Sequence, residues 1–416
     1  MNLLERYESV AQSYVRTAPI VYERARGAEI FDENGARYID FHSGGGTLTL
    51  GHNNFKVCSA LIDYLCKDGV TQTREKASVA KRSFVEAFVT NILTPRGLDY
   101  RFLFAEPAHG VAAELALRLA RRERKRSNVI AFTNSYHGLT EGALSVGSRH
   151  ATRYESIDLR RSTVFMPYCG YFGAGVDTIA YLQKHLEDAA SGVELPAAVI
   201  VEAVQYDAGV QVASPEWLNA LAQLCRKFDV LLVVDETQIG CGRTGPFFSF
   251  ERAGIVPDIV IAPVALAGGY PLSFLLIRPD LDHWRPGEQM GLLQGGNVSL
   301  IAAAELAAQW SDDVALTTTP ALAKLISERL HAMAARYPQK SVSVRGIGML
   351  HAMEFERAAS AAVVSSWALE RGLLVEPAGL RDQVLLIAPP VTIEEKVLRE
   401  GLDRLDAAVS MFLSHE

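Results

Sequence analysis

An aspartate at the end of a buried strand is the residue best placed to do chemistry in this sequence. Residues 230–234 form an unbroken aliphatic run, which is typical of a parallel strand buried on both faces, and Asp235 follows directly. Open α/β sheets bind ligands in the crevice outside the carboxyl ends of their strands, so this carboxylate is predicted to point into a ligand site. A glycine-rich loop and a second apolar strand over 258–262 come next.

Several short segments resemble the class III aminotransferases of fold type I, which use pyridoxal phosphate (PLP). These segments are Asp235-Glu-Thr-Gln238, Gly240-Cys-Gly-Arg-Thr-Gly245, Pro257-Asp-Ile-Val260, Tyr136-His-Gly138 and Val344-Arg-Gly346. The resemblance covers nearly the whole chain and is closest to the diaminobutyrate:2-oxoglutarate aminotransferases. It implies an α/β fold, with a large domain built on a mostly parallel sheet and a small α+β domain.

The sequence departs from this family at the position of the cofactor lysine. In the family, the strand at 258–262 is followed by a serine and by the lysine that binds the cofactor covalently and moves a proton. The matching residues here are Pro263 and Val264, and no lysine occurs between Lys227 and Lys324. Because valine can neither form that bond nor carry a proton, the sequence predicts that PLP-lysine chemistry has been lost.

The turn that would bind the cofactor phosphate also differs from the family. Relatives have Gly-Pro-Thr-Gly-Thr-Asn before a helix N-terminus, where N–H groups and hydroxyls match the phosphate charge. This chain has Glu106-Pro-Ala-His-Gly-Val111, which is predicted to place a carboxylate where it would repel phosphate. A threonine contributed across the family's dimer falls on Leu292. We therefore expect that PLP binding is lost and that there is no cofactor.

The ring side of the family's pocket matches this sequence well. Tyr136 corresponds to the aromatic residue that stacks on the pyridine ring, and Asp235 to the acid that pairs with its nitrogen. His137, Glu202 and Gln238 also match family positions. We interpret Tyr136, Glu202, Asp235 and Gln238 as vestigial cofactor positions, because buried polar groups that satisfy their neighbours are costly to rearrange.

The positions that would bind substrate are altered. Relatives often carry a basic residue in the strand before Pro389-Pro390, where it contacts the substrate carboxylate or a nearby acid, and the matching residue here is Leu386. Arg243 is kept. Tyr206 occupies a position that is glycine in relatives, so the pocket is expected to be smaller and differently shaped.

Three ionisable residues occur where relatives have small or apolar ones: His42, Glu106 and His109. With His137 and Asp235, they are hypothesised to line a rebuilt, cofactor-free site that performs general acid–base catalysis or binds a cation. The alternative is that the phosphate site has filled in, with Glu106 and His109 pairing at a helix start. No further ligands support a metal site, so none is expected.

Composition restricts the class of protein. A chain of 416 residues with 49% hydrophobic and 21% charged residues can bury a large core. Its net charge of −7 argues against nucleic-acid and anionic-membrane partners, which need a basic surface. The five cysteines have no metal-ligand spacing, and the first ten residues lack the apolar run of a signal peptide. A cytoplasmic protein that binds a small molecule is expected.

Three regions are expected along the chain. Residues 29–41 read as a hairpin with Asn34-Gly35 at its turn. They belong to an N-terminal segment, 1–53, that packs with the small domain in the family. Residues 54–337 alternate strands and helices and form the large domain, and 338–416 form the C-terminal small domain. The resemblance implies a homodimer; a heterodimer with a paralogue is the alternative.

Three functions remain open from the sequence. The favoured prediction is a repurposed, cofactor-independent enzyme acting on a small amino- or acyl-bearing metabolite in a biosynthetic pathway. The second is a pseudoenzyme, a non-catalytic partner subunit of an active aminotransferase paralogue. The third is a lysine-free enzyme that still uses PLP or pyridoxamine phosphate and is related to the diaminobutyrate aminotransferases.

Overall fold

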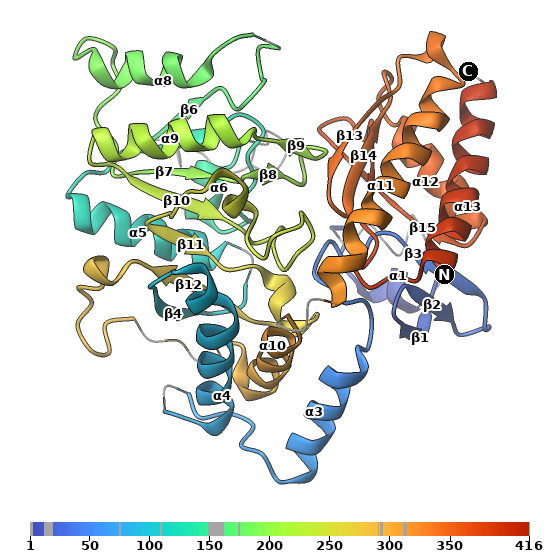
Figure 1. The fold of residues 1–416 in the computed structure, drawn as a ribbon, viewed down its shortest axis with the longest axis horizontal. Coiled ribbons are helices and arrows are strands. Elements are labelled where there is room, and N and C mark those ends of the chain that lie inside the picture. The colour runs from blue at the N-terminus through green and yellow to red at the C-terminus, as the bar shows by residue number, and fades with distance from the viewer. Residues whose placement is uncertain are drawn as a thin grey trace.

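The computed structural model describes residues 3–11, 20–74, 76–108, 110–148, 162–173, 175–289, 291, 294–310 and 314–415, without the side chains of 314–318. A seven-stranded sheet with its helices lies on one side of the molecule, and two four-stranded sheets lie on the other (Figure 1). No helix within those residues is long and apolar enough to cross a membrane.

The seven-stranded sheet forms the centre of the larger part. Its strands, in spatial order, are β4 (Arg101–Ala105), β12 (Ser273–Ile277), β11 (Ile259–Ile261), β10 (Leu231–Asp235), β7 (Ala198–Val201), β5 (Val129–Phe132) and β6 (Thr163–Met166). Pairing is antiparallel only on the two sides of β12 and parallel elsewhere. The predicted strands at 230–234 and 258–262 are confirmed as the neighbours β10 and β11.

Strand β10 is buried on both faces, as its aliphatic sequence predicts. Leu231 and Val233 belong to an apolar cluster that includes one face of helix α5 (Val111–Arg124). Leu232 and Val234 belong to the larger core on the opposite face, which includes α9 (Pro215–Lys227). Since successive side chains of a strand alternate in direction, one run of five aliphatic residues joins both layers.

Other helices surround this sheet. They are α3 (Phe55–Cys66), α4 (Val79–Phe88), α6 (Glu141–Val146), α8 (Thr178–Glu187) and α10 (Gly296–Trp310). Short 3-10 or π segments span Val89–Leu93, Thr94–Arg96, Ser249–Ala253, Val264–Ala267, Pro279–Leu281 and Pro338–Lys340. The small hairpin β8 (Val204–Gln205) with β9 (Gln211–Val212) projects from the sheet toward the other half of the molecule (Figure 1).

The two ends of the chain fold together. Strands β1 (Tyr22–Arg26), β2 (Glu29–Asp32), β3 (Arg37–Asp40) and β15 (Leu373–Leu374) form one sheet. Strands β13 (Ser343–Ile347), β14 (Leu350–Glu354), β17 (Val384–Ile387) and β16 (Glu376–Ala378) form the other. The remaining helices are α1 (Leu3–Tyr7), α11 (Val314–Ala335), α12 (Ser360–Glu370) and α13 (Glu395–His415). The predicted hairpin is confirmed, since β2 and β3 pair antiparallel across Asn34-Gly35.

A cluster of phenylalanines in edge-to-face contact packs between the sheet and the glycine-rich loop. Phe88, at the end of α4, is completely buried and makes edge-to-face contacts with Phe102 of β4, Phe274 of β12 and Phe247 of the loop. Each such contact adds to the free energy gained by burying the ring. The cluster therefore joins one edge of the sheet to the loop that follows Asp235.

Replacing Phe88 with alanine is expected to lower the free energy of unfolding by about 3–5 kcal/mol, because the ring leaves a cavity that its neighbours cannot fill. Denaturant unfolding would measure the change. Val89, the next residue, is 36% exposed. Val89→Ala is the matched control and should change the free energy by no more than about 0.5 kcal/mol. Equal effects of the two substitutions would contradict this description of the core.

Candidate functional site

A buried contact between a histidine and an aspartate lies at the carboxyl end of β10. The Nδ1 atom of His137 is 2.7 Å from Oδ2 of Asp235, and both side chains are almost completely buried. Burial disfavours the carboxylate, but the contact with His137 and the N–H of Thr237, 2.9 Å from Oδ1, more than offset it. The pKa of Asp235 is therefore lowered, and the group is a fixed negative charge.

The neighbouring carboxylate of Glu236 serves the loop. It is completely buried and accepts hydrogen bonds from the N–H and hydroxyl groups of Ser249 and from the N–H of Phe250. Burial raises the pKa of Glu236 to about 7 despite these bonds. Two adjacent acids thus have different tasks: Asp235 is directed to the site, and Glu236 fixes the loop that follows it.

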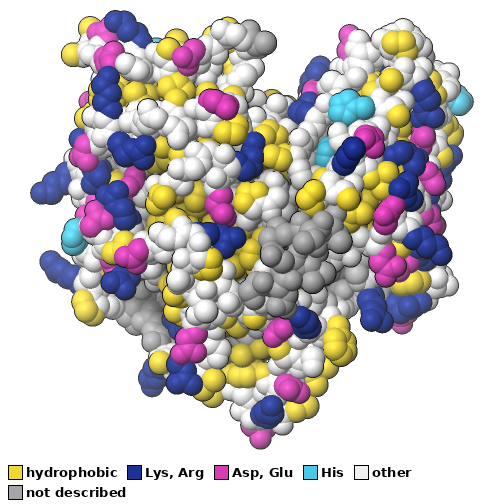
Figure 2. All heavy atoms as spheres, viewed as in Figure 1, with side chains coloured by type: hydrophobic (Ala, Val, Ile, Leu, Met, Phe, Trp, Pro, Cys, Tyr) yellow, Lys and Arg dark blue, Asp and Glu magenta, His cyan; other side chains and the backbone are white. Residues whose placement is uncertain are grey.

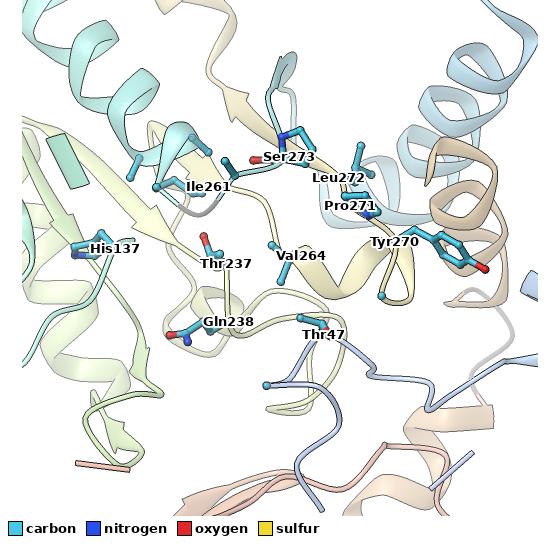
Figure 3. A pocket seen from close by; sticks show the side chains of 17 residues that line it. Thr47, His137, Thr237, Gln238, Ile261, Val264, Tyr270, Pro271, Leu272 and Ser273 are labelled. Atoms are coloured by element: carbon cyan, nitrogen blue, oxygen red, sulfur yellow. The ribbon is translucent and has the colours of Figure 1, made fainter. Parts of the chain in front are cut away.

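A cavity next to this contact, here called the main cavity, has a volume of about 360 Å³, within the usual range of small-molecule sites. It is lined by Gly45, Thr47, Pro107, Ala108, Gly110, Ala112, Ala113, His137, Thr237, Gln238, Ile261, Val264, Gly269, Tyr270, Pro271, Leu272 and Ser273. Figure 3 shows Val264 near the centre, with Thr237, Gln238 and His137 to one side and Tyr270 to the other. The lining is mainly apolar, with few polar groups.

A smaller cavity adjoins it on the side of Asp235. Tyr136, Glu202, Asp235 and Gln238 all line this space, and Gln238 and Thr237 line both cavities. The backbone N–H of Tyr136 donates to Oε2 of Glu202 at 3.1 Å. The structure therefore brings together the four positions interpreted from the sequence as belonging to a cofactor ring.

The N-terminus of α5 opens into the main cavity. Gly110 precedes the helix with a φ of 107°, no side chain caps the helix, and Gly110, Ala112 and Ala113 all line the cavity. The first N–H groups of a helix lack partners within the helix and carry partial positive charge, so such an end binds phosphate. A Cβ atom on Gly110 would lie 2.7 Å from Oγ1 of Thr140, so only glycine fits there.

The residues after β11 provide a hydrocarbon side chain. Val264 is partly buried, and its N–H donates to the carbonyl of Thr237 at 3.1 Å. This hydrogen bond holds the start of the segment Val264–Ala267 against the loop that follows Asp235. None of the chain's lysines, all of which lie in described segments, lines the main cavity. Lys227 and Lys324, the lysines on either side in sequence, form surface ion pairs with Glu187 and Glu328.

The five predicted catalytic residues are not all gathered in one place. His137 lines the main cavity and Asp235 the smaller one. The Oε2 atom of Glu106 accepts the N–H of Gln294 at 3.3 Å, and Glu106 is not part of either lining. His42 also lies outside both linings, although its ring is close to Gly45. His109 falls outside the described residues, as does Leu292.

The altered substrate positions are mostly buried. Tyr206 and Leu386 belong to one apolar cluster and do not line the main cavity. Arg243 is almost completely buried, and its guanidinium donates to the carbonyls of Ala388, Pro389 and Gly46. Burial lowers the pKa of Arg243. This arginine therefore joins the segment after β17 to the loop that contains Gly46.

Sequence reasoning missed four polar residues that line the main cavity: Thr47, Thr237, Tyr270 and Ser273. Thr237 follows Asp235 by two residues, and this position in the loop at the strand end could have identified it as a site residue. Tyr270 and Ser273 lie three residues apart in one segment, whereas Thr47 is distant in sequence, and only the folded chain brings it to them. In the described part of the chain, no group of three His, Cys, Asp or Glu side chains could hold a metal ion.

Comparison with known proteins places this geometry in a family. The model of the class-III aminotransferases matches residues 10–409. The chain belongs to the class-III aminotransferase family. A diaminobutyrate–2-oxoglutarate transaminase of Wolinella succinogenes is 44% identical over 413 residues, which cover 99% of this chain and 97% of that protein. One from Nocardia farcinica is 42% identical over 98% of this chain and 94% of its own length.

Solved structures agree with this assignment. The ornithine aminotransferase of Toxoplasma gondii is 25% identical and superposes with a TM-score of 0.86, over 99% of this chain and 94% of that one. A second structure of that enzyme, 26% identical with a TM-score of 0.84 over 99% and 93% of the two chains, has partial occupancy of PLP at its active site. This class-III aminotransferase thus has the fold type I architecture that its sequence predicts.

Family membership corrects the predicted function. The prediction of a repurposed, cofactor-free enzyme is wrong, and so are the expectation of no cofactor and the pseudoenzyme alternative, because the family and the named transaminases point to an active PLP enzyme. The physical reason is the position of Glu106. Its carboxylate was expected to repel phosphate, but it accepts the N–H of Gln294, and an uncapped helix end faces the cavity.

The residues present fit PLP without a covalent link. The N-terminus of α5 suits the phosphate, and the lowered pKa of Asp235 keeps a carboxylate for the ring nitrogen. His137 has one further ring nitrogen, Nε2, that is buried and has no hydrogen-bond partner among the described residues. Val264, which the resemblance places at the position of the family's lysine, offers no amine.

Gly110→Ala is expected to weaken PLP binding at least about tenfold, because the new methyl group would collide with Thr140 and displace the helix end. Equilibrium titration followed by absorbance would measure the affinity. Gly97 also has a positive φ, 63°, but a Cβ atom there meets nothing within 4 Å. Gly97→Ala therefore also places alanine at a positive φ, but without a collision, and it should leave the affinity unchanged. Equal losses in both variants would argue against phosphate binding at α5.

Proposed function

We propose that this class-III aminotransferase is a PLP-dependent enzyme that transfers an amino group of a diamino acid of the 2,4-diaminobutyrate class and holds its cofactor without a covalent bond to lysine. The substrate class is supported by relatives named diaminobutyrate–2-oxoglutarate transaminases, which are up to 44% identical over nearly the whole chain. The non-covalent cofactor is supported by the resemblance to the family, which places Val264 at the position of the family's lysine.

The observation that carries this proposal is the combination of an uncapped helix end on the main cavity and a buried carboxylate on the smaller cavity that adjoins it. The N-terminus of α5 and the loop after Asp235 come from different parts of the chain, yet residues of both line the same 360 Å³ space. A phosphorylated ring with a basic nitrogen needs both features. Neither feature alone would indicate that ligand.

Each residue of the site has a distinct task in this proposal. When bound, PLP supplies an electron sink for the carbon that loses a proton. Asp235 holds a positive charge at the ring nitrogen, and His137 keeps the carboxylate ionised and oriented through its 2.7 Å contact. The N–H groups at the start of α5 bind the phosphate. Tyr136 lies beside Asp235 in the smaller cavity, on the ring side of the site.

The absence of lysine changes how the cofactor is retained. Without a covalent bond, retention depends on the phosphate contacts and on the charge pairing at Asp235. Val264 adds only hydrocarbon surface to the pocket wall. The cofactor should therefore exchange with free PLP in solution, whereas an enzyme with a lysine at this position keeps it through covalent attachment.

Val264→Lys is expected to convert reversible cofactor binding into covalent binding. After incubation with PLP and reduction with borohydride, the intact mass of the variant should increase by one reduced cofactor, because the new amine reaches the cavity that Val264 lines. The unsubstituted protein should bind PLP but keep its original mass. Val264→Met, which has similar length and no amine, is the control.

Two results would overturn the proposal. A stoichiometric adduct on the unsubstituted protein would show that another lysine takes the family role. Failure of the unsubstituted protein to bind PLP would show that PLP is not its cofactor.

We further propose a homodimer. Exposed hydrophobic side chains gather on α3, where Phe55, Ile62 and Leu65 are 76%, 60% and 55% exposed. Val70 and Val79, in the segments that follow, are also exposed. Figure 2 shows hydrophobic side chains on the surface at the lower end of the molecule, where α3 and α4 lie in Figure 1. Apolar surface of this kind is typical of an interface between subunits.

Light scattering of the purified protein is expected to give twice the mass of one chain. The double substitution Phe55→Glu with Ile62→Glu should shift the protein toward the monomer, because two charges would be buried in the interface. Glu305→Gln on α10 is the control. A monomer at micromolar concentration, or a dimer unaffected by the double substitution, would contradict an interface on α3.

A further inference from the structure

The loop that follows β3 forms one wall of the main cavity. Gly45 and Thr47 of this loop, which spans residues 42–52, line the cavity. Thr47 lies on the opposite side of Val264 from Ile261 (Figure 3), and Ile261 belongs with residues of α5 to one apolar cluster. The 42–52 loop is therefore across the cavity from α5, away from the proposed phosphate site.

Three consecutive glycines make this wall flexible unless it is held. Gly44, Gly45 and Gly46 have φ values of 57°, 68° and 87°, a left-handed run that glycine adopts most readily. A Cβ atom on Gly46 would lie 3.1 Å from the carbonyl oxygen of Gln238, so the two loops approach each other closely. Because glycine loses more conformational freedom on folding than other residues, such a segment needs fixed ends to stay ordered.

A buried carboxylate contacts both ends of the 42–52 loop. Asp40, the last residue of β3, is 2% exposed, and its Oδ1 atom accepts the N–H groups of His42 and Ser43, both at 2.8 Å. Its Oδ2 atom lies 3.0 Å from Nε2 of His52, at the other end of the loop. Each oxygen of Asp40 thus serves a different end of the same loop.

These contacts keep Asp40 charged. Burial disfavours the carboxylate, but the hydrogen bond with His52 and the N–H groups of Ser43 and His42 more than offset it, so the pKa of Asp40 is lowered. Since an ionised carboxylate has no proton to donate, Nε2 of His52 carries the hydrogen of their contact. Hydrogen bonds with a charged partner are stronger than neutral ones, and this one closes the loop.

The backbone of His52 is held independently of its side chain. Its N–H and carbonyl groups form two hydrogen bonds of 2.8 Å with Gly27, in the turn between β1 and β2. The side chain of His52 is 22% exposed, so its replacement leaves no large buried cavity. A substitution at His52 therefore removes the contact with Asp40 while the path of the chain at this end stays in place.

We propose that His52 and Asp40 are positioning residues that hold the 42–52 loop in place against the amino substrate. This inference rests on the proposed function and adds two residues to it. The proposed cofactor takes the α5 and β10 sides of the site, so the wall formed by Gly45 and Thr47 meets the substrate. A wall that is already ordered lowers the entropy cost of binding. Neither His52 nor Asp40 lines a cavity, so both act through the loop.

Hydrogen exchange of the purified protein without substrate tests the contact itself. His52→Leu removes the N–H donor and keeps an apolar side chain, whereas His52→Gln keeps a donor near the position of Nε2. Backbone amides of residues 42–51 should exchange at least about tenfold faster in the leucine variant, the effect of losing a hydrogen bond to a charged group. The glutamine variant should stay close to the original rates.

Two titrations separate positioning from a general loss of structure. Absorbance measures the affinity for PLP, and calorimetry measures the affinity of the loaded protein for 2,4-diaminobutyrate. His52→Leu should weaken binding of 2,4-diaminobutyrate at least about tenfold and leave the affinity for PLP unchanged, because the loop lies away from α5. His52→Gln should restore most of the affinity for 2,4-diaminobutyrate.

His283→Leu is the matched control, because Nδ1 of the exposed His283 lies 2.8 Å from Oε2 of Glu123. It removes the same kind of contact far from the 42–52 loop in sequence, and it should leave exchange at 42–51 and both affinities unchanged. Unchanged exchange in His52→Leu, equal losses of both affinities, or equal effects of leucine and glutamine would overturn the positioning role. A protein that binds no PLP refutes the proposed function, whereas a loaded His52→Leu variant with full affinity for 2,4-diaminobutyrate refutes only the positioning role.

Discussion

The site depends on the contact between Asp235 and His137, a charged group held in the apolar centre of an α/β sheet. An isolated carboxylate would be protonated at this depth, and the 2.7 Å contact keeps its pKa low. The surrounding strand, loop and aromatic residues hold these two side chains in place. Strand β10 delivers the carboxylate, Glu236 fixes the following loop, and the phenylalanines around Phe88 support the loop from below. The sheet therefore predicts a ligand site at the carboxyl end of this strand.

Much of the fold could be predicted from local pattern. The aliphatic runs around 230–234 and 258–262 require burial on both faces, and they pair as parallel neighbours. Asn34-Gly35 determines a hairpin because few other residues adopt its turn. The parallel pairing of Leu373 with Ile39 could not be read from either segment alone. It joins strands more than 300 residues apart, and only the folded chain shows which segments meet.

The site was predicted less well, because residue identity does not determine where a side chain points. Asp235, His137 and Gln238 line the two neighbouring cavities, and their roles there stay predictions. Glu106 was misjudged: the sequence places it beside a helix start, but the path of residues 291–294 gives its carboxylate a backbone donor. Val264, the altered phosphate turn and Leu292 were together taken to exclude the cofactor. In the proposed site, the helix N-terminus and Asp235 would hold the phosphate and the ring of the cofactor without a covalent bond.

The most direct test of the central claim is titration of the unsubstituted protein with PLP, followed by phosphorus NMR of the bound phosphate and by dialysis. The account predicts one saturable site per chain, a shifted phosphate resonance, and full release of the cofactor on dialysis, because helix N–H groups and Asp235 bind it without covalent attachment. Absence of saturable binding, or a cofactor that dialysis cannot remove, would contradict a reversible PLP site built on α5 and β10.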